Sequence, residues 1–106
     1  MTTLKIGGEE RPFTTFFAPM RILGKQIGKP QLAQMGEVIA EMPLEKAPQF
    51  IHECLKRSAK VAGQDFKNTV QDVEGWLDED MNALIRAIEI IAKSISGEVE
   101  GKDQPQ

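Results

Sequence analysis

The C-terminal part of the chain carries the feature that most constrains its fold, which is a long series of apolar residues at helical spacing. From about residue 79 to residue 96, apolar side chains recur at intervals of three and four residues, as one face of an α-helix requires. The residues of this stripe are Met81, Leu84, Ile85, Ile88, Ile91, Ala92 and Ile95. A helix of this kind buries its stripe only against other elements, so the sequence predicts a packed, mainly helical domain.

Two more helices are predicted in the first half of the chain. The first runs from about residue 17 to Gly28, because Phe16, Met20, Leu23 and Ile27 are spaced four, three and four residues apart. The second is expected to begin at Pro30, which suits a first helical position, and to end at Pro43. Its predicted buried side carries Leu32, Met35, Ile39 and Met42.

Another two helices are predicted between residues 47 and 77. One begins near Ala47 and ends at Gly63, a natural C-terminal stop. Its expected apolar face comprises Phe50, Ile51, Cys54, Leu55, Val61 and Ala62. The other is a short helix from Val70 to about Leu77, preceded by Thr69 and Asp72 at the spacing of a capping box. Asp78 is then expected to cap the final helix.

The N-terminal segment has a different pattern, which predicts a β-hairpin over residues 3–16. Leu4 and Ile6 alternate with polar residues, and the Gly7-Gly8 pair suits the positive φ angles of a tight turn. The predicted fold is therefore mainly α, with a short N-terminal hairpin followed by a bundle of about five helices over residues 17–96. Residues 1–96 are expected to form a single domain, and residues 97–106, which are almost entirely polar, a disordered tail.

Charge and cysteine content exclude several classes of function. The formal net charge is −3 and the pI near 5.2, so the chain has no basic excess for nucleic acid or an anionic membrane. Cys54 is the only cysteine, which rules out an internal disulfide and a thiolate metal cluster. No apolar stretch is long enough to span a bilayer, and no secretory signal pattern is present. We therefore expect a cytoplasmic protein.

The sequence predicts neither a catalytic site nor a metal or cofactor site. His52 is close to Cys54 in sequence, but residues two apart on a helix point away from each other. Cys54 also lies among apolar residues, where a thiol is inert. The acidic run from Asp78 to Asp80 lacks the ligand spacing of a calcium loop, and its charge suits a helix N-terminus. We therefore expect a protein that is not an enzyme.

The order of sequence features resembles the tail assembly chaperones of long-tailed bacteriophages. The features are residues 4–13 (LKIGGEERPF), a Phe-rich step into a helix with Leu-Gly-Lys, residues 48–60 (PQFIHECLKRSAK), residues 68–78 (NTVQDVEGWLD) and the ending IAKSIS. The resemblance covers about residues 3–96. It implies a non-enzymatic phage or prophage protein that binds and solubilises the tape measure protein, helps to recruit tail tube subunits and is absent from the mature virion. The polar C-terminus would correspond to the short form of such chaperones.

A holding chaperone for a helical partner needs apolar residues that its own core does not use. We expect these residues to be Phe13, Phe16, Phe17, Trp76 and Ile90. The edge strand and surplus apolar surface would also allow self-association, because a second copy of the chain can cover them. Two other functions stay open, a structural joining protein of the phage and a small helical adaptor or regulator.

Overall fold

The computed structural model describes residues 2–96, and these form an N-terminal hairpin followed by five α-helices. The predicted fold class is confirmed. The elements are β1 (Thr3–Ile6), β2 (Glu9–Pro12), α1 (Phe17–Gln26), the 3-10 turn η1 (Leu32–Gln34), α2 (Met35–Ala40), the 3-10 turn η2 (Leu44–Lys46), α3 (Ala47–Val61), α4 (Val70–Glu79) and α5 (Asn82–Ser96). The predicted disordered tail falls on residues 97–106, outside the described residues.

The hairpin begins the fold and packs against helices from the far end of the chain. Its antiparallel strands are joined by Gly7 and Gly8 at φ 64° and 78°, which L side chains rarely adopt. Leu4 and Ile6 are buried, while Thr3 and Lys5, which alternate with them, are exposed. Because an isolated two-stranded hairpin is marginal in water, this burial against the helices is what stabilises it.

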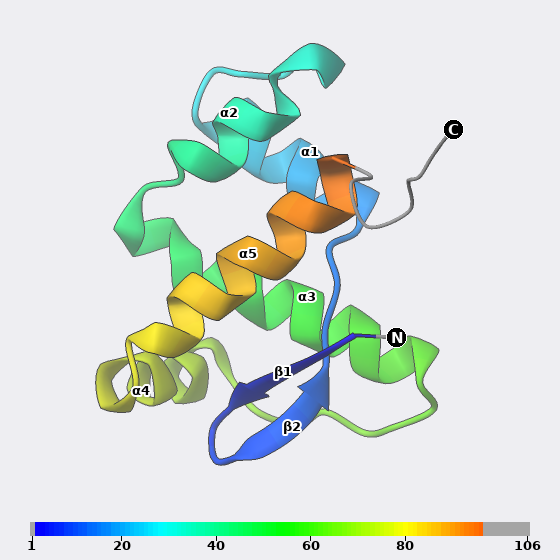
Figure 1. The fold of residues 1–106 in the computed structure, drawn as a ribbon, viewed down its shortest axis with the longest axis vertical. Helices are drawn as coiled ribbons and strands as arrows, with labels where there is room; N and C mark the ends of the chain where they lie inside the picture. The colour runs from blue at the N-terminus through cyan, green and yellow to red at the C-terminus, as the bar shows by residue number, and fades with distance from the viewer. Residues whose placement is uncertain (1, 97–106) are drawn as a thin grey trace.

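One cluster of buried side chains joins the hairpin to all five helices. Its largest fully buried members include Phe13, Leu4, Ile51, Leu55 and Ile91. Figure 1 shows the hairpin and α4 at one end of the long axis, with η1 and α2 at the other. One core therefore extends between the two ends of the molecule.

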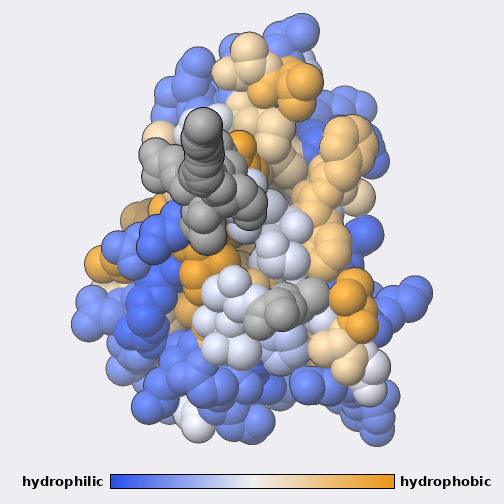
Figure 2. Space-filling view, turned by 45° about the vertical axis from the view of Figure 1, so that its right-hand side comes forward, coloured by the Kyte–Doolittle hydropathy of each residue, from blue (hydrophilic) through white to orange (hydrophobic). Residues whose placement is uncertain are grey.

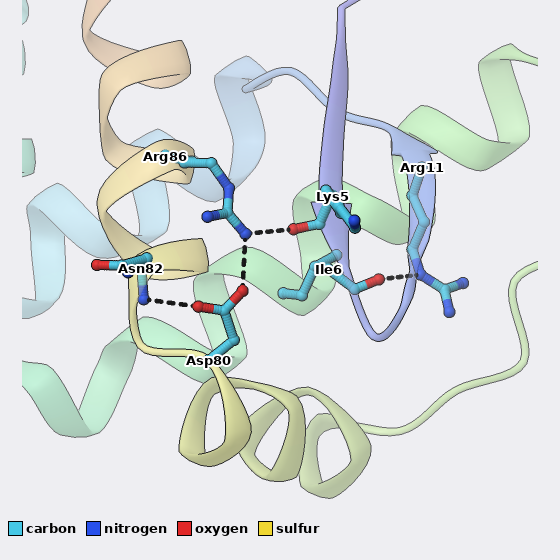
Figure 3. Close-up of polar contacts among 6 residues, drawn as sticks. All are labelled: Lys5, Ile6, Arg11, Asp80, Asn82 and Arg86. Carbon is cyan, nitrogen blue, oxygen red and sulfur yellow. Dashed lines mark hydrogen bonds and ion pairs between the residues drawn. The ribbon is translucent and has the colours of Figure 1, made fainter.

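Polar contacts fix α5 against the hairpin. Arg86 on α5 donates from Nη2 to the backbone carbonyl of Lys5 on β1 and to the carboxylate of Asp80, both at 2.9 Å (Figure 3). Asp80 also accepts a hydrogen bond from the backbone N–H of Asn82 at 3.1 Å, at the start of α5. One guanidinium thus connects the first strand, the α4–α5 turn and the last helix.

The boundaries of the last two helices differ from the sequence prediction. The capping box of α4 is confirmed, with Thr69 Oγ1 accepting from the backbone N–H of Asp72 and the Asp72 carboxylate accepting from that of Thr69. Asp78, however, lies inside α4 rather than capping α5, because α4 continues to Glu79. The expectation that all three acidic residues lie at a helix N-terminus is wrong for Asp78 and Glu79; only Asp80 has that place.

The buried face of α5 is rotated from the predicted stripe. Ala83, Ala87 and Ile91 are fully buried, whereas Met81 and Ile85 are 71% and 58% exposed. Small Ala side chains let the helix approach its neighbours closely, and the larger residues beside them are displaced toward solvent. The prediction that Met81, Ile85 and Ala92 belong to the buried stripe is therefore wrong.

Two earlier helices also depart from their predictions. The predicted helix from Pro30 is instead the turn η1 followed by the short α2, and Pro30 precedes both. Gln34 Oε1 accepts from the backbone N–H of Gln31, which caps η1 as a separate turn. In α3 the first four residues of the predicted face, from Phe50 to Leu55, are buried, but Val61 and Ala62 are exposed because the last turn extends past the core.

Candidate functional site

An apolar groove of about 410 Å³ lies between α1 and the η1–α2 segment. Its apolar lining comprises Phe16, Phe17, Met20, Leu32, Met35 and Val38. Figure 2 turns forward the side of the molecule on which α1 begins, and hydrophobic residues form a band down the right-hand side of this view, above a base that is mostly hydrophilic. A concave apolar surface of this kind is typical of a site for an apolar ligand or a partner side chain.

Two large side chains of this groove stand out in solvent. Phe17, the first residue of α1, and Leu32, the first residue of η1, are each 79% exposed. Phe16, the residue before Phe17, has an extended backbone, with φ −137° and ψ 159°. The chain therefore enters α1 directly at the groove. Exposed large hydrophobic residues gathered around one concavity mark an interaction site more strongly than the same residues scattered singly.

The floor of the groove depends on a close approach at Gly24. The backbone N–H of Lys29 donates to the carbonyl of Gly24 at 2.7 Å, which folds the segment after α1 back along the helix. A Cβ on Gly24 would lie 2.8 Å from the backbone oxygen of Lys29 and 3.6 Å from Val38 Cγ2. Only glycine leaves room there, so this residue sets the distance between the two walls.

Lys29 connects the turn that follows α1 to α2, which belongs to the second wall of the groove. Its Nζ lies 3.0 Å from a carboxylate oxygen of Glu37 and 3.5 Å from one of Glu41, both in or next to α2. The hydrogen bond that Lys29 donates to Glu37, together with the charge of Glu41, raises the pKa of Lys29 above its ordinary value. Lys29 is therefore engaged within the fold.

A second apolar groove, of about 670 Å³, lies on the other side of η1–α2, toward α5. Its lining includes Ile39, Ile88, Ala92 and Ile95, and it shares Leu32 and Met35 with the first groove. The η1–α2 segment is thus a ridge with an apolar hollow along each side, and Leu32 is the large hydrophobic residue that this ridge exposes. A helix lying beside the ridge would bury it in the helix-in-groove manner.

The five residues expected to bind a partner do not form one site. Phe16 and Phe17 line the α1–α2 groove. Phe13 is fully buried in the core, so it does not meet the expectation that the core leaves it free. Trp76 and Ile90 are both half-buried and pack against the core.

Trp76 and Ile90 also lie away from the groove. Trp76 belongs to α4, at the opposite end of the long axis, where the guanidinium of Arg11 lies 4.5 Å from its ring centroid. Ile90 lines a shallow hollow between α5 and β1. Neither residue is among those that line the α1–α2 groove.

Leu32 is the site residue that the sequence did not reveal. Its spacing from Met35 and Ile39 matches the buried side of one continuous helix, whereas the chain forms a 3-10 turn before α2 and turns Leu32 outward. The signal in the sequence for this break is the Lys29-Pro30 pair. A proline disfavours the α conformation of the residue before it, which separates the η1–α2 segment from α1.

The groups with possible chemical reactivity are engaged in structure. The Cys54 thiol is fully buried, and desolvation raises its pKa to about 12. His52 Nε2 lies 2.8 Å from the backbone oxygen of Asn68, so its ring connects α3 to the segment before α4. On α3, Arg57 pairs with Glu53 at 2.8 Å, next to the exposed Lys56 and Lys60.

Within residues 2–96, no helix combines the length and apolarity that a membrane crossing requires. In the same part of the chain, three or more His, Cys, Asp or Glu side chains nowhere gather as a metal ion would need. Comparisons of the chain with protein-family models, curated proteins and solved structures find no match.

Proposed function

We propose that the chain is a non-enzymatic binding protein that holds an apolar helical segment of another protein in the α1–α2 groove. The observation that carries this proposal is the position of Phe17 and Leu32, which are highly exposed and line the same 410 Å³ groove from opposite walls. Leaving two such side chains in water has a cost that a bound apolar partner removes. Met20 and Met35 add flexible thioethers, which adapt to partners of varying shape.

The resemblance to tail assembly chaperones supplies the identity of the partner in this proposal. The partner is the tape measure protein of a long-tailed phage or prophage, kept soluble in the host cytoplasm, and the complex helps to recruit tail tube subunits. The chain itself is absent from the finished virion. The net charge of −3 supports this role, because like charge on the free surface limits aggregation of the loaded chaperone.

Co-expression tests the proposal. The chain is produced together with the tape measure protein encoded in the same genome, and the soluble yield and co-purification of that protein are measured with and without the chain. We expect both to rise with the chain present. The Phe17→Ser variant, which keeps the core intact because Phe17 is exposed, should lose most of the co-purified protein.

Two outcomes would support the other functions instead. A tape measure protein that stays insoluble and does not co-purify contradicts the proposal and favours an adaptor of a host protein. Mass spectrometry of purified virions that finds the chain in the particle contradicts a chaperone and favours a joining protein.

A further inference from the structure

Charge is distributed unevenly along the chain, and the groove lies in its only long basic segment. Residues 11–36 contain Arg11, Arg21, Lys25 and Lys29 and no acidic residue, so all 16 Asp and Glu residues lie elsewhere. This segment supplies every residue that lines the α1–α2 groove except Val38. The two charged residues that line the groove, Arg21 and Lys29, are therefore both cations, although the protein carries a net negative charge.

Arg21 is the cation that the groove leaves available. It follows Phe17 by four residues in α1, which places the two side chains on the same helical face, and both line the groove. Arg21 is exposed and makes no hydrogen bond or ion pair with residues 2–96. Lys29, the other cation in the lining, is held by Glu37 and Glu41.

A guanidinium beside an apolar groove discriminates between partners by charge. A carboxylate that reaches Arg21 can accept two parallel N–H bonds from its planar fork, while a lysine at the same place is repelled. Lys25, one turn further along α1, is also exposed and adds to the positive potential. The apolar residues supply contact area and the cations supply orientation and selectivity.

We infer that the groove binds a segment of another protein that is apolar on one helical face and carries at least one Asp or Glu beside that face, and that this carboxylate pairs with Arg21. This inference rests on the proposed function, because it specifies the partner of the same groove.

Two synthetic peptides test the inference directly. Each has about 18 residues with leucines along one helical face, and they differ only in carrying two glutamates or two lysines beside that face. Fluorescence anisotropy measures their binding to the full chain. We expect the glutamate peptide to bind about threefold to tenfold more tightly at about 50 mM NaCl, and the ratio to fall toward one at about 500 mM NaCl.

A pair of charge-reversal variants assigns the effect to Arg21. Arg21→Glu should reverse the preference, so that the lysine peptide binds more tightly. Lys60→Glu makes the same change of net charge at an exposed position on α3, away from the groove, and should keep the wild-type preference. Equal binding of both peptides to the wild type, binding of neither, or an equal effect of the two variants would overturn the inference.

The same variants separate this inference from the proposed function. If the tape measure protein co-purifies equally well with the wild type and with Arg21→Glu, the role of Arg21 is refuted and the proposed function stands. If that protein does not co-purify but the charge preference is found, the proposed function fails and the character of the groove stands. If Arg21→Glu instead converts an oligomer of the chain into a monomer in light scattering while neither peptide binds, the occupant is a second copy and the inference is overturned.

Discussion

The guanidinium of Arg11 lies 4.5 Å from the centroid of the Trp76 ring, and the same ring lies so close to Gly7 that a Cβ there would be 2.6 Å from Trp76 Cε2. Arg11 also donates from Nε to the carbonyl of Ile6 at 3.0 Å (Figure 3). The single tryptophan thus fastens α4 to the hairpin turn. A large aromatic residue placed between two elements is an anchor of the fold, even though a part of it reaches solvent.

We predict that Trp76→Ala destabilises the protein without weakening its groove. The free energy of unfolding should fall by roughly 2–4 kcal/mol, because the variant loses a large packed ring and its interaction with Arg11. Urea unfolding measures the loss. Peptide binding per mole of folded protein should stay at the wild-type value, and a variant with normal stability but no binding would show that Trp76 belongs to the binding site.

We predict that Gly24→Ala destabilises the protein, because Gly24 lies where the two walls of the groove approach each other. Gly24→Ala places a Cβ 2.8 Å from the oxygen of Lys29, so the free energy of unfolding should fall by roughly 1–3 kcal/mol. Gly75→Ala is the matched control, because Gly75 lies in α4 with nothing within 4 Å of the added atom. This control should stabilise the protein by about 0.5–1 kcal/mol through helix propensity, and an equal loss in both variants would refute the close approach.

The Cys54 thiol should be protected from reagents in the folded protein. Burial raises its pKa from 9.0 to about 12, so the thiolate fraction at mildly alkaline pH falls by about a thousandfold, and the reagent must also enter the core. A disulfide reagent added to the native protein should react far more slowly than the same reagent added in urea. A fast reaction in the native state would contradict the burial of Cys54.

Stability should fall in acid through Asp72 and Asp80. The backbone N–H of Thr69 lowers the pKa of Asp72 below 3.8, and the hydrogen bond from Arg86 does so for Asp80. A folded pKa below the unfolded value means that the stabilisation is complete above the unfolded pKa and is lost as pH falls through the folded pKa. The loss therefore begins as pH falls below about 4.

The variants Asp72→Asn and Asp80→Asn should each reduce this dependence when unfolding is measured at about pH 6 and about pH 3. Asp65→Asn is the control, because Asp65 makes no hydrogen bond or ion pair with residues 2–96. If all three variants show the wild-type loss of stability in acid, the two carboxylates are not its source.

Local patterns in the sequence predict much of the fold. The Gly7-Gly8 turn, the Thr69–Asp72 capping box and the stop at Gly63 each depend on a few neighbouring residues, and all are present. Which face of a helix becomes buried depends instead on distant partners. The sequence could not show that Ala83 and Ala87 of α5 face the core, because that choice depends on how closely the hairpin approaches.

The groove is predictable only in part for the same reason. Phe16 and Phe17 stand out in the sequence as a cluster of aromatic residues before a helix, and both line the groove. The spacing of Leu32 from Met35 and Ile39 predicts that Leu32 is buried, but it is exposed in the groove. Spacing alone does not distinguish a stripe that packs in the core from a stripe that binds a partner. The prediction that Phe13 is available to a partner fails for the converse reason, because Phe13 is the largest fully buried side chain.

A comparison of Leu32→Ser with Leu44→Ser tests whether the α1–α2 groove is the binding site. The two leucines are each the first residue of a 3-10 turn and are 79% and 78% exposed, but only Leu32 lines the groove. Both variants should fold with nearly wild-type stability, so the amount of tape measure protein that co-purifies reports on binding alone. We expect Leu32→Ser to reduce that amount by about tenfold while Leu44→Ser leaves it unchanged. Equal co-purification with both variants would contradict the assignment of the α1–α2 groove as the binding site.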